Sequence, residues 1–328
     1  MSIFEKAFEN MGDKSGRDQG DELLRPLDDL PGIPESRESA DTDSLFAGQP
    51  EGNVGAASPD DAGPRGDGIY QSDGQGKPIK LDLTGLKAAG LVDPRADKTN
   101  RTAEEFRRIK RPLLMHVEGK GASQVGNANL IMVTSSLAGE GKTFTSINLA
   151  MSIAMEMDKT VLLVDADVAK PDVTSRLGIQ AEAGLIDVLL DESMVLQDVL
   201  LRTDIPKLTL LPSGRRHVHA TELLASERMR QLTLDLSTRY HDRIVIFDTP
   251  PLLLTSEARV LAGLMGQVVV VVEEGRTSQD VVKEAVALLA ANEIVGVVLN
   301  KGMRRGRGQY GGGYGYGYGY GYGYGYRQ

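Results

Sequence analysis

The stretch that most constrains this chain is a glycine-containing turn, residues 135–143, which reads Ser-Ser-Leu-Ala-Gly-Glu-Gly-Lys-Thr. Residues 130–133 before it, Leu-Ile-Met-Val, predict a buried strand. After it, Phe144, Ile147 and Met151 recur at helical spacing. The first amides of a helix lack intrahelical partners, and the helix dipole adds positive charge there. A strand, this turn and a helix therefore predict an anion site.

The residue types within the turn suit the phosphates of a nucleotide. Gly139 and Gly141 let the backbone wrap closely around a phosphate. Lys142 can reach the β- and γ-phosphates, and the hydroxyl of Thr143 can bind Mg²⁺. Ser136 stands where the strict phosphate-loop pattern has its first glycine. We predict that the nucleotide contacts are Ala138, Gly139, Glu140, Gly141, Lys142, Thr143 and Phe144.

Composition excludes several other classes of function. The formal net charge of -9 argues against nucleic acid as a partner. The absence of cysteine excludes disulfides, thiol catalysis and thiolate metal sites, and 4 histidines disfavour a zinc enzyme. No apolar run approaches the roughly 18 residues that cross a bilayer, and the first residues do not resemble a signal peptide. We therefore expect a cytoplasmic protein.

The chain divides into three regions by composition. Residues 1–100 are acidic and rich in Gly, Pro, Ser and Asp, so we expect them to be mostly disordered. An apolar island at 79–91 could pack on the region that follows. Residues 101–303 should form the folded domain, and residues 304–328 a Gly/Tyr-rich tail without a core.

The folded domain should be of the α/β class. Several of its apolar runs are β-branched and do not alternate with polar residues, which is typical of parallel strands covered on both faces. Helical patterns separate them, for example at 280–291. We expect a mostly parallel sheet with helices on both faces and strands at 130–134, 160–164, 208–211, 243–247, 267–272 and 295–299.

Two acidic clusters follow predicted strands. Asp165 and Asp167 come directly after one strand, and Asp248 after another. Ligands bind at the carboxyl ends of parallel strands, so these side chains should meet the phosphate loop there. Paired carboxylates can combine a Mg²⁺ ligand with a proton acceptor. We predict that Thr143, Asp165 and Asp248 bind Mg²⁺.

A charged helix should begin near Thr102. Glu105 lies three residues after Thr102, as in a capping box. Its charges suit either a solvated face or a subunit contact through Arg–carboxylate pairs.

The last region alternates Gly and Tyr. One interpretation is a low-complexity segment that self-associates through aromatic rings. The other is a row of accessible hydroxyls that accept phosphate, namely Tyr310, Tyr314, Tyr316, Tyr318, Tyr320, Tyr322, Tyr324 and Tyr326.

Taken together, residues 103–301 and the tail resemble the bacterial tyrosine kinases that control exopolysaccharide synthesis, in particular the stand-alone autokinases. The resemblance rests on a modified P-loop at 136–143, an Asp-x-Asp motif at 165–167, Asp-Thr-Pro-Pro at 248–251 and the tyrosine cluster. It implies a P-loop NTPase-like fold. The family's Glu-x-x-Arg-x-x-Arg motif implies a ring contact. The position of Phe106 favours the register Glu104, Arg107 and Lys110, although Glu105, Arg108 and Arg111 fit the motif literally.

The resemblance implies a tyrosine autokinase that uses ATP and Mg²⁺. Lys142 would stabilise the transferring phosphoryl group, and Asp165 or Asp167 would help to deprotonate the tyrosine. The implied partners are other copies of the chain in a ring, the cytoplasmic end of a membrane chain-length (co-polymerase) activator that could recruit the protein to the membrane, and a phosphotyrosine phosphatase. The family usually has Arg at the position of Ala169 and Pro at that of Ala138.

A second interpretation is a nucleotide-switch ATPase of the cell-division and partition type. Those proteins share the expected sheet and carry a lysine early in their phosphate loop. Leu137 occupies that position here, which disfavours the alternative.

Overall fold

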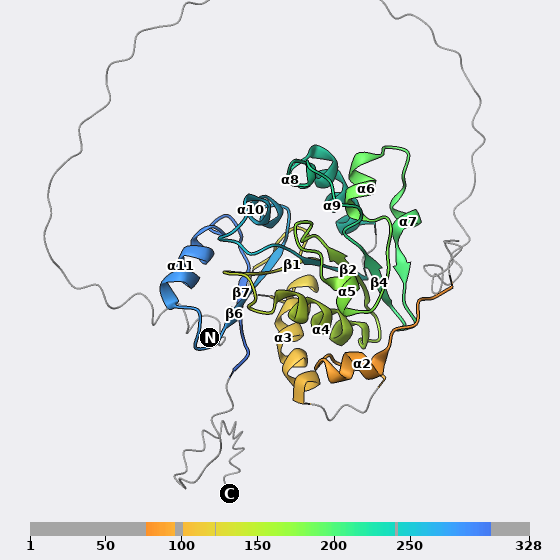
Figure 1. Ribbon diagram of the computed structural model, residues 1–328. Coiled ribbons are helices and arrows are strands. Elements are labelled where there is room, and N and C mark those ends of the chain that lie inside the picture. The colour runs from red at the N-terminus through yellow and green to blue at the C-terminus, as the bar shows by residue number, and fades with distance from the viewer. Residues whose placement is uncertain (1–76, 96–100, 122, 240–241, 303–328) are drawn as a thin grey trace, which may run out of the picture. The chain divides into compact units, whose positions relative to one another are not determined.

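A single seven-stranded sheet organises the part of the chain that the computed structural model describes, residues 77–95, 101–121, 123–239 and 242–302 (Figure 1). The strand order is β3-β4-β2-β5-β1-β6-β7, and every neighbouring pair is parallel except β3 with β4. The strands are β1 (Leu130–Ser135), β2 (Thr160–Asp165), β3 (Leu201–Arg202), β4 (Leu208–Leu211), β5 (Arg243–Asp248), β6 (Gln267–Glu273) and β7 (Val295–Asn300). The six predicted strands and the parallel sheet are confirmed.

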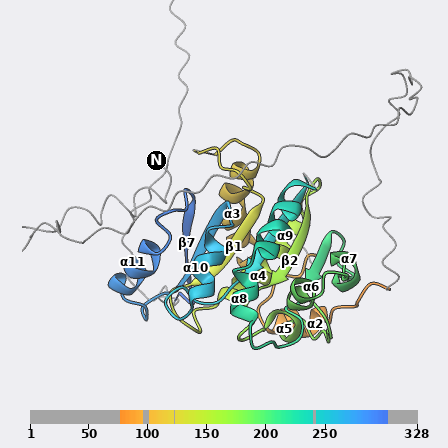
Figure 2. The same ribbon diagram turned by 90° about the horizontal axis from the view of Figure 1, so that it is seen from above.

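Helices cover both faces of the sheet, as expected. Alternate residues of β1 point to opposite faces: Ile131 and Val133 enter one apolar core with α3 and α4, and Leu130 and Met132 enter a second core with α9 and α10. The helices are α2 (Leu83–Ala88), α3 (Arg101–Val117), α4 (Lys142–Ala154), α5 (Val173–Arg176), α6 (Leu185–Leu190), α7 (Leu196–Val199), α8 (Ala220–Leu224), α9 (Glu227–Thr238), α10 (Ser256–Ala262) and α11 (Gln279–Ala287). Figure 2 shows β7 at one edge of the sheet, beside α11.

Two helix boundaries differ from the prediction. Helix α3 begins at Arg101, so Thr102 lies in its first turn rather than at its N-cap. Helix α11 ends at Ala287, four residues before the predicted end, and the chain continues to residue 291 in turns. Local patterns fix the register of a helix better than its last residue.

The fold begins earlier than the predicted boundary at residue 101. Residues 77–95, which we call the N-terminal strap, contain α2 and bury Leu81, Leu86, Leu91 and Val92 against the same core as α3 and α4. At β3, the Ile79 amide donates to the Arg202 carbonyl oxygen, and the Ile79 carbonyl oxygen accepts the Asp204 amide. The Val92 amide donates to Oδ1 of buried Asn148 at 2.7 Å. The apolar island therefore does pack on the domain, because it carries enough large side chains to join the core.

Within the described residues, none of the helices has the length and apolar character needed to span a bilayer. The predicted tail, with its tyrosines from Tyr310 to Tyr326, and residues 1–76 lie outside the described part of the chain.

Candidate phosphoryl-transfer site

The predicted phosphate loop connects the end of β1 to the start of α4. Its two glycines adopt backbone angles that other residues rarely reach, with φ of 86° at Gly139 and 100° at Gly141. Gly141 is the N-cap of α4, so the free amides of the first turn face outward from the helix end. The loop has the backbone form of an anion site.

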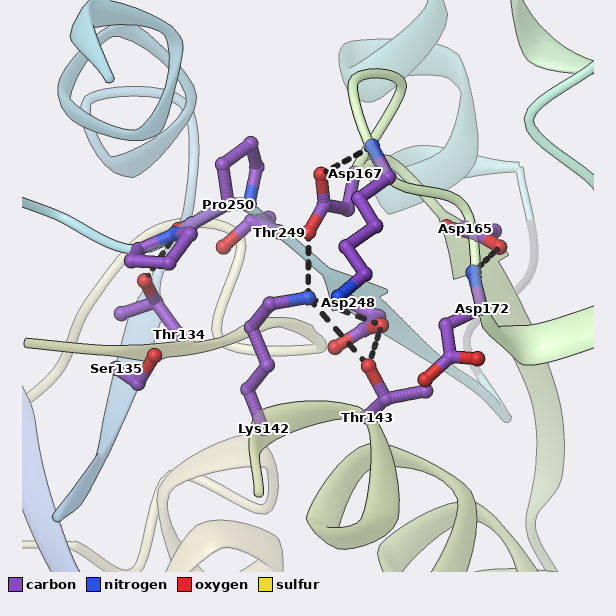
Figure 3. Close-up of polar contacts among 12 residues, drawn as sticks. Thr134, Ser135, Lys142, Thr143, Asp165, Asp167, Asp172, Asp248, Thr249 and Pro250 are labelled. Atoms are coloured by element: carbon purple, nitrogen blue, oxygen red, sulfur yellow. Dashed lines mark hydrogen bonds and ion pairs between the residues drawn. The ribbon is translucent and has the colours of Figure 1, made fainter. Parts of the chain in front are cut away.

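Lys142 and Thr143 begin α4 and point at the carboxyl ends of β2 and β5 (Figure 3). The Lys142 ammonium lies 2.5 Å from Oδ2 of Asp167 and 3.7 Å from Oδ2 of Asp248. The Thr143 hydroxyl donates to Oδ2 of Asp248 at 2.8 Å. Residues separated by about a hundred positions are thus joined in one polar cluster, which is the convergence that the strand ends predicted.

Asp165 and Asp248 are direct partners in the register of β2 and β5, and both are fully buried. Burial raises the pKa of Asp165 to about 7, and the nearby Asp248 carboxylate adds to the effect. Two backbone amides, those of Asp172 and Val173, donate to its Oδ2 at 3.2 and 3.1 Å. Its Oδ1 has no hydrogen-bond partner. The buried pair therefore gives up its protons less readily than exposed carboxyl groups do.

Burial also raises the pKa of Asp248, although Lys142, Thr143 and Ser146 oppose the shift. Ser146 donates to Oδ1 of Asp248 at 3.0 Å from the second turn of α4. Sequence reasoning missed Ser146. The signal was present, because Thr143 and Ser146 are three positions apart on one helix and so face the same strand end.

The cluster fits a magnesium ion. Thr143, Asp165 and Asp248 offer only oxygen ligands, which Mg²⁺ prefers, and the partnerless Oδ1 of Asp165 is an acceptor available to a cation. Among the described residues, no group of three or more Asp, Glu, His or Cys side chains is arranged to hold a metal by itself. A magnesium ion here would need further oxygens from nucleotide phosphates and water.

Two of the predicted nucleotide residues direct their side chains elsewhere. The Glu140 carboxylate is buried and accepts the Leu137 amide at 2.7 Å. The Phe144 ring packs edge-on against Phe106 of α3, with ring centroids 6.3 Å apart. These residues can serve a nucleotide through their backbone only.

Lys170 follows Ala169 in the loop after β2 and is exposed. Its backbone amide donates to Oδ1 of Asp167 at 3.0 Å. The main chain of Lys170 thus helps to hold the carboxylate that pairs with Lys142.

On α3, the subunit contact at Glu104, Arg107 and Lys110 stays a prediction, but Lys110 does not lie on the surface of the chain. Its ammonium is buried in its own chain, 2.6 Å from the Ser152 carbonyl oxygen and 2.6 Å from Oε1 of Glu156. Phe106 and Lys110, one turn apart, both face the core. Glu105, Arg108 and Arg111 lie on the exposed side. All three members of this literal register are therefore exposed, whereas in the other register Glu104 is exposed, Arg107 is half-buried and Lys110 is buried.

Comparison with known proteins agrees with this geometry. Residues 128–290 match the family described as AAA domain. Tyrosine-protein kinase YwqD of Bacillus subtilis is 34% identical over 183 residues, which cover 55% of this chain and 76% of that protein. The chain belongs to the bacterial tyrosine kinase family.

Other bacterial tyrosine kinases share the same region. Tyrosine-protein kinase wzc of Salmonella typhi is 32% identical over 182 residues, 55% of this chain but only 25% of that protein. The crystal structure of the VpsO kinase domain matches with a TM-score of 0.53 and 35% identity, covering 61% of this chain and 94% of that domain. The matched region is thus about a quarter of wzc and nearly all of the VpsO kinase domain.

Proposed function

We propose that this protein is an ATP-dependent protein-tyrosine kinase that phosphorylates its own C-terminal tyrosines. The observation that carries the proposal is the Lys142 ammonium held between Asp167 and Asp248 at the N-terminus of α4, in a chain of the tyrosine kinase family. A cation and free helix amides stabilise the charge of phosphate groups. Nearby carboxylates supply a proton acceptor.

In this proposal the phosphate loop binds the β- and γ-phosphates of ATP through its amides, and Lys142 stabilises negative charge on the transferring group. The tyrosine oxygen forms a bond to the γ-phosphorus, the bond from that phosphorus to the β–γ bridging oxygen breaks, and ADP leaves. The tyrosine proton passes to Asp165 or Asp167. A carboxylate is needed because a free tyrosine hydroxyl has a pKa of about 10.

Mg²⁺ is the proposed cofactor, held by Thr143, Asp165 and Asp248. When bound, it neutralises charge on the phosphates. The Asp165 carboxylate, whose pKa burial raises to about 7, is the group that such a cation would return to its ionised form.

The acceptors are the tyrosines between Tyr310 and Tyr326. A tethered tail reaches the active site of a neighbouring copy at high effective concentration, so we propose transfer in trans within a ring. The exposed Glu105, Arg108 and Arg111 of α3 are suited to pair with a second copy. Each phosphate adds about -1.5 to -2 charges, and several on one tail should loosen the ring by repulsion.

In this proposal the kinase activity regulates exopolysaccharide synthesis and export, as the resemblance to the bacterial tyrosine kinases implies. We propose that the cytoplasmic end of a membrane chain-length (co-polymerase) protein activates the kinase and recruits it to the inner face of the membrane. A phosphotyrosine phosphatase would reset the tail.

The test is phosphotyrosine formation by the purified full chain with Mg-ATP, with and without a peptide from the cytoplasmic end of the activator. We expect labelling of the wild type, its loss in Lys142→Met, and its loss on truncation after Gly308. Lys283→Met, an exposed lysine of α11, should label normally. ATP hydrolysis without tyrosine labelling, even with the peptide, would favour the nucleotide-switch ATPase instead.

A further inference from the structure

Two residues at the end of β7, Asn300 and Lys301, hold the phosphate loop through hydrogen bonds to its backbone. The Lys301 ammonium donates to the Gly139 carbonyl oxygen at 2.7 Å. The side-chain amide of Asn300 donates to the next carbonyl oxygen, that of Glu140, at 2.9 Å. Two consecutive peptide groups of the loop are therefore held from the same side.

This arrangement fixes where the loop amides point. In a trans peptide the carbonyl oxygen and the following N–H point in opposite directions, and no cis peptide occurs among the described residues. With the Gly139 and Glu140 carbonyls turned toward β7, the N–H groups of Glu140 and Gly141 must face the other way. That is the side on which an anion binds to such a loop.

A second set of bonds steadies the same turn. The buried Glu140 carboxylate accepts the Leu137 amide at 2.7 Å, the Glu273 amide at 3.3 Å and the hydroxyl of Thr277. Lys301 also pairs with Oε2 of Glu273 at 3.1 Å. The loop is thereby joined to the ends of both β6 and β7.

The backbone has unusual geometry at these contacts. Lys301 has a φ of 56°, in the left-handed region that a lysine seldom occupies. A Cβ on Gly141 would lie 2.0 Å from Nδ2 of Asn300, so only glycine permits the approach of this side chain. Strain of this kind is commonly found at functional sites.

We propose that Asn300 and Lys301 are positioning residues for the nucleotide phosphates. They act through the loop: by holding two carbonyls, they pre-orient the amides of Glu140 and Gly141 toward the β-phosphate. The inference rests on the proposed function only in that a nucleotide occupies the loop, and it does not depend on tyrosine being the acceptor.

The test is the dissociation constant for ADP, measured by titration calorimetry on the full chain with Mg²⁺. We expect Lys301→Met and Asn300→Asp each to raise the Kd about tenfold, because each removes one donor to a loop carbonyl. The conservative Lys301→Arg keeps a charged donor and should recover most of the affinity. Lys283→Met, on α11, is the matched control and should leave the Kd unchanged.

A different result is expected if Asn300 and Lys301 only stabilise the fold. In that case Lys301→Met and Lys301→Arg would lose affinity equally, in step with their melting temperatures, and the proposal would be overturned. An ADP Kd within about twofold of the wild type in both Lys301→Met and Asn300→Asp would also overturn it. Since binding of ADP is the readout, the outcome stands apart from whether the protein phosphorylates tyrosine. If it does, the KM for ATP should rise more than kcat falls.

Discussion

The ammonium of Lys142 lies 2.5 Å from Oδ2 of Asp167, so the lysine at the start of α4 is already paired across the site with the loop after β2. Burial lowers the pKa of Lys142, but Asp248 and Asp167 outweigh burial and the net shift is upward. Lys142 is thus cationic at any physiological pH. A phosphate entering the loop would share this cation with Asp167, and the freed carboxylate could then accept a proton.

The first prediction separates these two roles of the pair. Asp167→Asn should lower kcat for tyrosine phosphorylation by about a hundredfold or more, the usual effect of losing a proton acceptor. The same change should leave ADP binding equal or tighter, because it removes a negative charge near the phosphates. Lys142→Met, by contrast, should lose both activity and affinity. Asp167→Asn with kcat within about tenfold of the wild type would rule out this carboxylate as the acceptor.

The second prediction concerns stability and pH. The folded-state pKa of Asp165 is about 7, above its ordinary value of 3.8, so the folded protein holds this proton more tightly than the unfolded chain. The stabilisation is fully present below about pH 4 and is lost as the pH rises through 7. Without nucleotide or metal, Asp165→Asn should therefore melt higher than the wild type at pH 8, by on the order of 5 °C.

That difference in melting temperature should shrink toward pH 5, where the wild-type carboxyl is protonated. Asp158→Asn, at an exposed position, is the control and should change melting little at either pH. An Asp165→Asn variant less stable than the wild type at pH 8 would contradict the raised pKa.

Much of the sheet and of the site could be predicted from the sequence because both depend on local patterns. Continuous apolar runs identified six of the strands. The rule that ligands bind at the carboxyl ends of parallel strands predicted that Lys142, Asp165, Asp167 and Asp248 lie close together, as they do. The two-residue strand β3 and the short helices α5 to α8 carry too few residues for a period to show.

Other features depend on tertiary contacts that no local pattern encodes. Asn300 and Lys301 reach a loop about 160 positions earlier in the chain. Aromatic placement suggested a register for α3 that includes Lys110, yet Phe106 and Lys110 share the face that packs on α4. A buried lysine is exceptional, and here the Ser152 carbonyl and Glu156 make it stable.

The third prediction tests whether the exposed register of α3, rather than the one that contains Lys110, makes the contact between copies. Arg108→Glu and Arg111→Glu reverse exposed charges and should weaken self-association, measured as mass by light scattering, without lowering the melting temperature. Lys110→Met should leave mass unchanged but lower stability, because it leaves Glu156 and the Ser152 carbonyl without their partner. Unchanged mass in the two arginine variants, together with a lower mass in Lys110→Met, would favour the register that contains Lys110.

The fourth prediction concerns the N-terminal strap and the helix that carries the phosphate loop. Asn148 of α4 is fully buried, accepts the Val92 amide at 2.7 Å and donates to the Phe144 carbonyl at 2.9 Å. Asn148→Ala should cost about 1–3 kcal/mol of unfolding free energy, since it leaves a buried amide unpaired. Hydrogen exchange should then accelerate across residues 79–92.

The control is Asn292→Ala, which removes a single hydrogen bond to the Ala262 carbonyl far from the strap. This variant should leave hydrogen exchange in the strap unchanged. Strap exchange equal in the two variants would show that its apolar residues, rather than Asn148, hold it on α4.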